Sequence, residues 1–172
     1  MSGFSIRLAR PEDAQGFHEV EEDAATLLAE EASLEGIPVP PAQSESHYRS
    51  LIAKGNCLSA VESEQIVGFA AAGRIGRDLH LHELSVRRSA QRCGIGATLL
   101  RALTIDARNC GIRAITLNTF RDIPWNAPFY ARHGFVEVEN FESRQHLAEA
   151  LDAAAEFGLP RERRVAMILF LD

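Results

Sequence analysis

The hydrophobic pattern of this chain changes its period several times, and this alternation sets the class of fold. Segments that alternate apolar and polar residues, or that run branched residues together, are typical of strands, whereas apolar residues three and four apart indicate helices. From the N-terminus, the pattern predicts a strand, two helices and three strands, followed by helix, strand, helix, strand, helix and strand. The sequence therefore predicts a mixed α/β domain with a central sheet of about six to seven strands flanked by helices.

The length and composition are those of one domain. The chain has 172 residues, 46% of them hydrophobic, which is enough for a full core. We find no linker, and we treat residues 1–172 as a single domain. Its expected strands cover residues 4–9, 57–62, 66–74, 79–86, 113–120, 135–140 and 164–172. Helices are expected from residue 11 onward and over residues 44–53, 93–110, 125–133 and 143–157.

Charge and cysteine content argue against several functional classes. The formal net charge is −6 and no run of five basic residues occurs, so we expect no nucleic-acid partner. No stretch approaches the roughly 18 apolar residues of a membrane span, so we expect no membrane partner. The three cysteines, Cys57, Cys93 and Cys110, form no C-x-x-C pair of the kind found in zinc or redox sites. Their odd number and the lack of an apolar leader predict a cytoplasmic protein.

The stretch QRCGIGATLL, residues 91–100, places two glycines at the predicted start of a helix that follows a strand. Free N–H groups and the helix dipole favour an anion there, and glycine removes Cβ atoms that would block its approach. The phosphate-binding P-loop needs a Lys that is absent, and the dinucleotide-binding fingerprint needs a third glycine where Leu99 stands. What remains is Gln91-x-x-Gly94-x-Gly96, for which an ordinary strand-to-helix turn is the alternative interpretation.

This pattern resembles the pyrophosphate-binding segment of the GNAT acyltransferase superfamily, Arg/Gln-x-x-Gly-x-Gly/Ala. Two further segments match in order. HLHELSV (residues 80–86) resembles the fourth strand of that superfamily, and WNAPFYARHGF (residues 125–135) resembles its Asn-x-x-x-Tyr-x-x-x-Gly-Phe segment. The resemblance covers most of residues 4–140 and the final strand. It implies a GNAT fold and an N-acetyltransferase that uses acetyl-CoA as co-substrate and needs no metal.

The resemblance also implies which residues bind acetyl-CoA. In the superfamily the pantetheine arm pairs with the fourth strand like an added strand, and the pyrophosphate lies on N–H groups of the glycine turn. The matching residues here are Leu84, Ser85, Val86, Gln91, Arg92, Cys93, Gly94, Ile95, Gly96, Ala97 and Asn126. Three of them keep an alternative: Arg92 as a solvated surface residue, Cys93 as an incidental loop residue, and Asn126 as a helix N-cap.

Direct acetyl transfer needs a base for the amine and an acid for the departing thiolate. The resemblance assigns the acid to Tyr130, whose alternative role is that of a core aromatic residue. A phenol with an ordinary pKa of about 10 stays protonated at neutral pH. The candidate bases are His80, His82 and Glu83. The histidines share one face of a regular strand and resemble the pair of arylalkylamine-type members, whereas Glu83 faces the other side unless a β-bulge redirects it.

We therefore expect transfer of an acetyl group from acetyl-CoA to a primary amine in a ternary complex. A small-molecule amine is favoured over a protein N-terminus or lysine, and a larger acyl donor or a non-catalytic acyl-CoA-binding module are the alternatives. The acidic run 19–31 is expected as a solvated helix face, with attraction of a cationic amine as the alternative, and the loop 36–41 as a candidate apolar lid. Residues 142–163 add a helix to the short hairpin usual in the family. This helix is expected to pack on the sheet, cover the acceptor site or make a homodimer contact.

Overall fold

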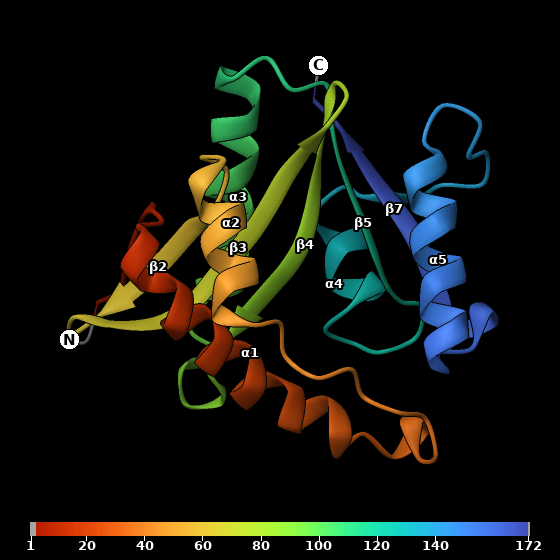
Figure 1. Cartoon of the computed structure of the whole chain (residues 1–172), viewed down its shortest axis with the longest axis horizontal. Helices are drawn as coiled ribbons and strands as arrows, with labels where there is room; N and C mark the ends of the chain where they lie inside the picture. Colours follow the sequence, from red (N-terminus) through yellow and green to blue (C-terminus); the bar gives the residue numbers. More distant parts are fainter. Residues whose placement is uncertain (1–2, 172) are drawn as a thin grey trace.

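A mixed sheet of seven strands forms the centre of the structure, a computed structural model that describes residues 3–171 (Figure 1). The strand order is β1-β2-β3-β4-β5-β7-β6. The strands are β1 (Ser5–Leu8), β2 (Leu58–Glu62), β3 (Gln65–Ile75), β4 (Asp78–Val86), β5 (Ala114–Phe120), β6 (Val136–Glu137) and β7 (Arg164–Phe170). The predicted α/β class and order of elements are confirmed. The terminal residues Met1, Ser2 and Asp172 of the expected single domain lie outside the described part of the chain.

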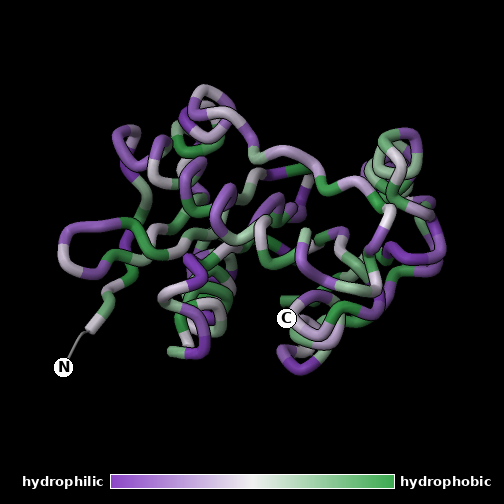
Figure 2. The backbone as a smooth tube through the Cα atoms, turned by 90° about the horizontal axis from the view of Figure 1, so that it is seen from below, coloured by the Kyte–Doolittle hydropathy of each residue, from purple (hydrophilic) through white to green (hydrophobic). Residues whose placement is uncertain are grey.

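Helices cover both faces of the sheet. They are α1 (Ala14–Ala29), α2 (Glu45–Ala53), α3 (Ile95–Asn109), α4 (Ala127–Arg132) and α5 (Gln145–Phe157). On one face, Phe17 of α1 and Tyr48 of α2 pack on Phe69 of β3, with ring centroids 4.2 and 5.1 Å from that of Phe69. α5 lies on the same face, where Leu147 packs with Ala166 of β7, and α3 and α4 pack on the opposite face. The helix tubes in Figure 2 change between purple and green along their turns, as expected of helices with one apolar side.

β4 and β5 pair over only three residues each and then diverge. Their parallel ladder joins Asp78–His80 to Ala114–Thr116, whereas β5 pairs with β7 along its whole length. Figure 1 shows the two strands separating like the arms of a V beyond that ladder. Among the described residues, the part of β4 after His80 therefore has no strand partner on the side of β5.

A β-bulge in β4 lies beside this gap. Ala71 of β3 pairs with Glu83, and the next residue, Ala72, pairs with Leu81, so His82 is the extra residue. Ala71 belongs to the cluster under α1 and α2, whereas Leu81 belongs to the main core on the opposite face. The bulge therefore turns Glu83 to the face that carries α1, α2 and α5, the face to which His82 also belongs. The sequence left open whether a β-bulge redirects Glu83, and the structure shows that one does.

Several elements are shorter than the sequence predicts, and for β6 and α3 the structure gives the reason. β6 has two residues instead of the predicted strand 135–140, because it pairs only with β7 at the sheet edge before the chain leaves for α5. α3 begins at Ile95 rather than at Cys93, because Gly94 has a φ of +80° and an α-helix requires a negative φ.

The segment 142–163 packs on the sheet and also reaches the gap between β4 and β5. Beyond α5, Leu159 joins Leu34 and Phe120 in a small buried cluster. Leu34 belongs to the segment that follows α1, which extends toward the lower end of α5 in Figure 1. The segments after α1 and after α5 therefore meet at the end of β5. Of the three expected roles of this segment, packing on the sheet is confirmed.

Candidate active site

A cavity of about 750 Å³ occupies the gap between β4 and β5. Its walls come from α1 and the loop after it, β4, the start of α3, β5, α4 and β7. Most residues that the sequence assigned to the site line this cavity: His82, Glu83, Leu84, Ser85, Val86, Gln91, Arg92, Gly94, Ile95, Gly96, Ala97, Asn126 and Tyr130. Within residues 3–171, Cys93 and His80 are the two assigned residues that lie outside the lining.

The glycine turn forms one end of the cavity. Gly94 precedes α3 with its φ of +80°, and a Cβ built on it would meet no other described atom within 4 Å. A Cβ on Gly96 would meet Phe129 and Val86 at 3.9 Å, which is ordinary contact. Packing within the chain therefore does not require a glycine at 96, whereas the positive φ favours one at 94. The open space and the N-terminal N–H groups of α3 suit a pyrophosphate.

The edge of β4 that faces the gap suits an extended ligand. The backbone groups of Leu84–Val86 on this edge lie beyond the last pair that β4 makes with β5. Gln91 fixes the chain after the strand, because its Nε2 donates a 3.0 Å hydrogen bond to the carbonyl of Val86. A ligand with amide groups in an extended chain, such as a pantetheine arm, fits such an edge as an added strand.

Asn126 stands at the N-cap position of α4, yet its side chain makes no cap hydrogen bond. Instead, its Oδ1 accepts a 2.5 Å hydrogen bond from Oγ1 of Thr119 on β5. This bond joins the start of α4 to the end of β5 and holds the amide in the cavity wall. The structure therefore departs from the alternative role of Asn126 as a side-chain cap.

Tyr130 combines a packed ring with a place in the cavity wall. Its ring centroid lies 5.2 Å from that of Phe129 and 5.5 Å from that of Phe135. Burial, with the negative charge of Glu83, raises the pKa of the Tyr130 hydroxyl above its usual value near 10. The phenol therefore stays protonated at neutral pH and is able to donate into the cavity.

Glu83 is the carboxyl that the bulge turns into the cavity. Its Oε1 accepts a 2.7 Å hydrogen bond from Oγ of Ser85. Burial and the negative charge of Glu21 raise the pKa of Glu83 to about 7, while the Ser85 hydrogen bond and the positive charge of Arg164 oppose the rise. Glu83 is therefore ionised in part at neutral pH, as a general base requires.

The two strand histidines occupy different environments. His80 is buried, and burial with the nearby charges of His82 and His146 lowers its pKa to about 3. Its Nδ1 shares a 2.9 Å hydrogen bond with Oγ1 of Thr116, which lies 3.3 Å from Nε2 of His146. His82 lines the cavity, and its pKa is lowered mainly by burial. His80 is therefore a neutral member of a side-chain network, and no sequence signal linked it to His146 on α5.

Two further charged side chains, Glu21 and Arg164, line the cavity beside Glu83. Glu21 of α1 accepts a 2.5 Å hydrogen bond from the Tyr48 hydroxyl, although its acidic run was expected to face solvent. Arg164 lies at the start of β7, with its guanidinium carbon 4.8 Å from the ring centroid of Phe120. A charged residue at a strand end is ordinary, so nothing in the sequence marked Arg164.

Residues 3–171 hold no group of three or more His, Cys, Asp or Glu side chains placed to bind a metal ion. No helix in the described part of the chain is long and apolar enough to cross a membrane.

The comparisons with known proteins agree with this geometry. Residues 28–149 match the family model described as acetyltransferase (GNAT) domain. The chain belongs to the GNAT family. The protein is thus an acetyl-CoA-dependent N-acetyltransferase, and acetyl-CoA is its co-substrate. The expectation drawn from the glycine turn and the Tyr130 segment is confirmed at the level of family and activity.

Solved GNAT structures share the fold at low identity. PaiA N-acetyltransferase from Thermoplasma acidophilum, solved with coenzyme A, is 17% identical over 98% of this chain and 99% of its own, with a TM-score of 0.70. N-acetylglutamate synthase from Neisseria gonorrhoeae, with coenzyme A and N-acetyl-glutamate, is 19% identical over 100% of this chain and 36% of its own (TM-score 0.70). The ribosomal-protein-S18-alanine N-acetyltransferase from Escherichia coli is 16% identical over 99% and 95% of the chains (TM-score 0.68).

Proposed function

We propose that this GNAT enzyme acetylates the primary amine of a small molecule by direct transfer, with Glu83 as the base and Tyr130 as the acid. One observation carries the proposal: a carboxyl with a pKa of about 7 and a protonated phenol line the same cavity in the gap of the sheet. Titratable groups whose surroundings push their protonation states apart are typical of acid–base catalysis.

The binding residues would direct the co-substrate along β4. Bound acetyl-CoA supplies an acetyl group activated as a thioester. The glycine turn before α3 offers N–H groups to the pyrophosphate, and Arg92 beside it adds a positive charge. The edge of β4 at Leu84–Val86 holds the extended arm. The arm then leads into the part of the cavity that Glu83 and Tyr130 line.

Glu83 prepares the amine for attack. Primary amines have pKa values near 10 and arrive mostly as ammonium ions, which carry no free electron pair. A carboxylate with a pKa of about 7 is a stronger base than an ordinary Glu and is still ionised in part at neutral pH. Glu83 accepts the proton, and the freed nitrogen attacks the thioester carbonyl.

Tyr130 completes the transfer on the leaving side. The departing sulfur carries negative charge as its bond to the acetyl carbon breaks, and the phenol donates a proton to it. Burial disfavours the resulting phenolate, so Tyr130 regains a proton readily afterwards. The packed rings of Phe129 and Phe135 hold the hydroxyl in place during this exchange.

The apolar wall at the acceptor end supports a small acceptor over a protein tail. Apolar side chains from α1, from the loop after it and from the segment after α5 line this end: Leu27, Leu28, Val39, Pro40 and Leu159. Pro38 of that loop packs against Gly158, so closely that a Cβ on Gly158 would lie 2.9 Å from it. The relatives act on different acceptors by their names, so the family alone does not set this choice.

His82 is the second candidate base, since it lines the cavity beside Glu83. Its pKa is lowered from the ordinary 6.5, which makes it a weaker base than Glu83 with a pKa of about 7. We therefore assign the base to Glu83 and treat His82→Ala as a matched variant. If Glu83 is the base, that variant keeps most of the turnover.

The test is release of the CoA thiol from acetyl-CoA over a panel of amines: arylalkylamines, polyamines, amino acids, aminoglycosides and short peptides. We expect amine-dependent release with one class of small amine. Glu83→Gln should lower kcat by about 10²–10⁴ with little change in acetyl-CoA affinity, as for the loss of a general base. Release with peptides alone would overturn the small-molecule acceptor. Unchanged kcat in Glu83→Gln would overturn the assignment of the base.

A further inference from the structure

Arg164 is a half-buried cation without an ion-pair partner in the described part of the chain. The other half-buried arginines, Arg7, Arg87, Arg144 and Arg163, each pair with a carboxylate. The Nε of Arg164 is buried and has no hydrogen-bond partner among the described residues. A buried charged donor left unpaired is costly, so its retention in the wall of a cavity points to a ligand.

The guanidinium of Arg164 has no ion-pair partner among the described residues, but its packing against Phe120 fixes its position. Its carbon lies 4.8 Å from the ring centroid of Phe120, the residue directly opposite in the β5–β7 ladder. Stacking on an aromatic ring orients the guanidinium plane and leaves the edge with its N–H groups for an in-plane partner. A carboxylate is the partner whose geometry matches that edge.

The same cavity wall contains a buried hydrogen-bond acceptor that, like Nε of Arg164, has no partner among the described residues. Oδ1 of Asn118 has no hydrogen-bond partner among the described residues, although its Nδ2 donates at 3.3 Å to the carbonyl of Leu147. The carboxyl of Glu83 also lines the cavity, close enough to Arg164 for each charge to affect the pKa of the other. This end of the cavity therefore offers acceptors for an ammonium group and a donor for an anion.

We propose that the acceptor carries a carboxylate beside its amine, as a free amino acid does, and that Arg164 binds this carboxylate while Glu83 and Asn118 receive the amine. The inference rests on the proposed function and names its substrate class. In the reaction, one ammonium proton passes to Glu83, the free amine forms the N–C bond, and the C–S bond breaks as Tyr130 protonates the sulfur. The acetylated nitrogen then gives up its second proton, which returns the Tyr130 phenolate to the neutral phenol, and Glu83 releases its proton to solvent. The carboxylate takes no part in these steps and fixes the position of the nitrogen.

Matched pairs of acceptors test the proposal. CoA release from saturating acetyl-CoA is measured with free L-amino acids and with their α-carboxamides, which have the same side chain and an uncharged group in place of the carboxylate. We expect kcat/KM to favour the free acid by about tenfold or more, the value of one charge-assisted hydrogen bond. The amine of the carboxamide is the less basic of the two, so a larger fraction of it is unprotonated at neutral pH, and a preference for the acid does not come from a greater supply of free amine.

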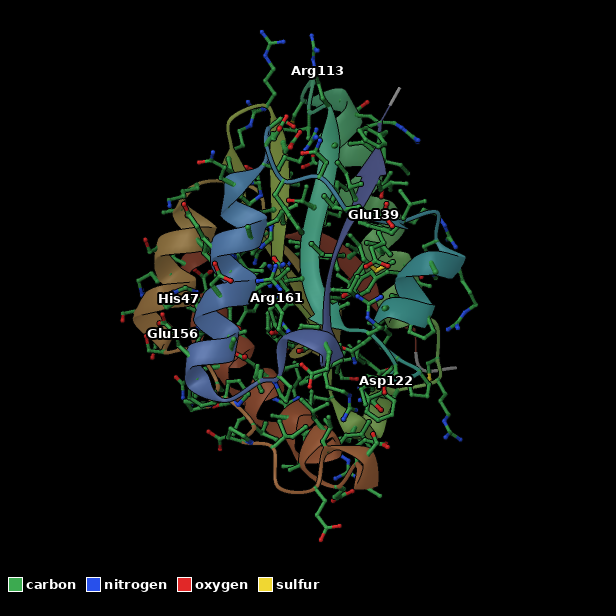
Figure 3. All side chains as sticks on the ribbon, turned by 90° about the vertical axis from the view of Figure 1, so that its right-hand side faces the viewer. His47, Arg113, Asp122, Glu139, Glu156 and Arg161 are labelled. Carbon is green, nitrogen blue, oxygen red and sulfur yellow. The ribbon has the colours of Figure 1, made fainter. Side chains whose placement is uncertain are left out.

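Variants of Arg164 tie the preference to this residue. Arg164→Gln should raise KM for the free acid by about tenfold or more and leave KM for acetyl-CoA and for the carboxamide unchanged. Arg164→Lys should restore part of the preference. Arg113→Gln is the matched control, since Arg113 precedes β5 and points away from the protein at the opposite end from Asp122 in Figure 3. It should change none of these values.

A binding measurement keeps the proposal testable without turnover. Isothermal titration of the same amino acids into the CoA-loaded protein should show binding that Arg164→Gln weakens by about tenfold or more and Arg113→Gln preserves. Equal kcat/KM for acid and carboxamide, or an equal loss for both in Arg164→Gln, would overturn the proposal while leaving the acetyltransferase intact. A preference for uncharged or phosphate-bearing amines would also overturn the proposal, as would a panel in which no amino acid binds or reacts. Silence with every amine class would instead count against the proposed function.

Discussion

The hydroxyl of Ser85 donates a 2.7 Å hydrogen bond to Oε1 of Glu83, two residues earlier on the same face of β4. This bond stabilises the charged carboxylate. It opposes the two effects that raise the pKa of Glu83, which are burial and the negative charge of Glu21. A change at Ser85 alone can therefore shift the pKa of Glu83, and with it the fraction of the proposed base that is ionised.

Replacement of Ser85 by Ala should move the pH dependence of the enzyme. Without the hydroxyl, the pKa of Glu83 rises above about 7, so less carboxylate is present at neutral pH. The acid limb of kcat/KM should move up by roughly one unit, since about 1.4 kcal/mol corresponds to one pKa unit. Ser85→Thr keeps the hydroxyl and serves as the control. An acid limb that stays in place in Ser85→Ala would contradict the assignment.

Glu83 should also make the stability of the protein depend on pH. Its pKa is raised in the folded state, so the folded protein holds the proton between the ordinary value of 4.5 and about 7. Stability is therefore lost as the pH rises through this window. Glu83→Gln should raise Tm relative to the wild type at pH 8 and leave it nearly unchanged at pH 4.5. We expect at least several degrees, since each pKa unit corresponds to about 1.4 kcal/mol and 1 kcal/mol shifts Tm by about 2–4 °C in a domain of this size.

Thermal unfolding of both proteins from pH 4.5 to pH 8 measures this effect. The difference in Tm has to grow with pH, because only the ionised form of Glu83 is penalised by burial. Glu149→Gln on α5, for which no role in the site is proposed, controls for the general loss of one negative charge. A constant difference between wild type and Glu83→Gln across the range would count against an elevated pKa.

That the glycine turn and the Tyr130 segment line the cavity could be predicted, because their signals are contiguous in the sequence. Gln91, Gly94 and Gly96 stand within six residues of one another, and Tyr130 lies in a recognisable segment of its own. Local rules suffice for such elements: a positive φ selects glycine, and a helix N-terminus attracts an anion. The end of β6 was overestimated because alternation alone does not show where a sheet edge loses its partner.

The opposite side of the cavity could be predicted only in part, because distant segments build it: Glu83 was a candidate, whereas Arg164 was not. Glu21, Glu83 and Arg164 come from α1, β4 and β7, and only the fold brings them to one cavity. The face of Glu83 depends on a bulge that the alternation of β4 does not reveal. The place of Arg164 depends on β7 entering the sheet beside β5. Each is a tertiary relation, invisible to periodicity.

Gly96 offers a test in which stability and binding change in opposite directions. It is the second residue of α3, where an Asp gains about 0.3–1 kcal/mol from the helix dipole and replaces a poor helix former. The same negative charge would lie beside the pyrophosphate of acetyl-CoA. Gly96→Asp should therefore keep or raise Tm, while the Kd for acetyl-CoA rises by at least about tenfold, or about 1.4 kcal/mol.

Gly96→Asn is the matched variant, because it has nearly the size of Asp without the charge. Titration calorimetry with acetyl-CoA at low and high salt separates the two effects, since salt screens the repulsion. The Asp variant should recover affinity with salt more than the Asn variant does. An unchanged Kd in Gly96→Asp would show that the pyrophosphate lies elsewhere and that the glycine serves only the turn.

Tyr130→Phe removes the proposed proton donor and little else. The ring of Tyr130 packs between Phe129 and Phe135, and a Phe keeps these contacts, so the fold and the binding of acetyl-CoA should persist. We expect kcat to fall by about 10²-fold, the lower range for loss of a general acid, with Kd for acetyl-CoA changed less than about threefold.

The loss of kcat in Tyr130→Phe should be largest for the acetyl donor with the poorest leaving group. An aryl thioester of acetate, whose thiolate needs no proton, should be turned over almost equally by Tyr130→Phe and wild type. Equal losses with both donors would mean that Tyr130 positions the substrate rather than protonating the sulfur.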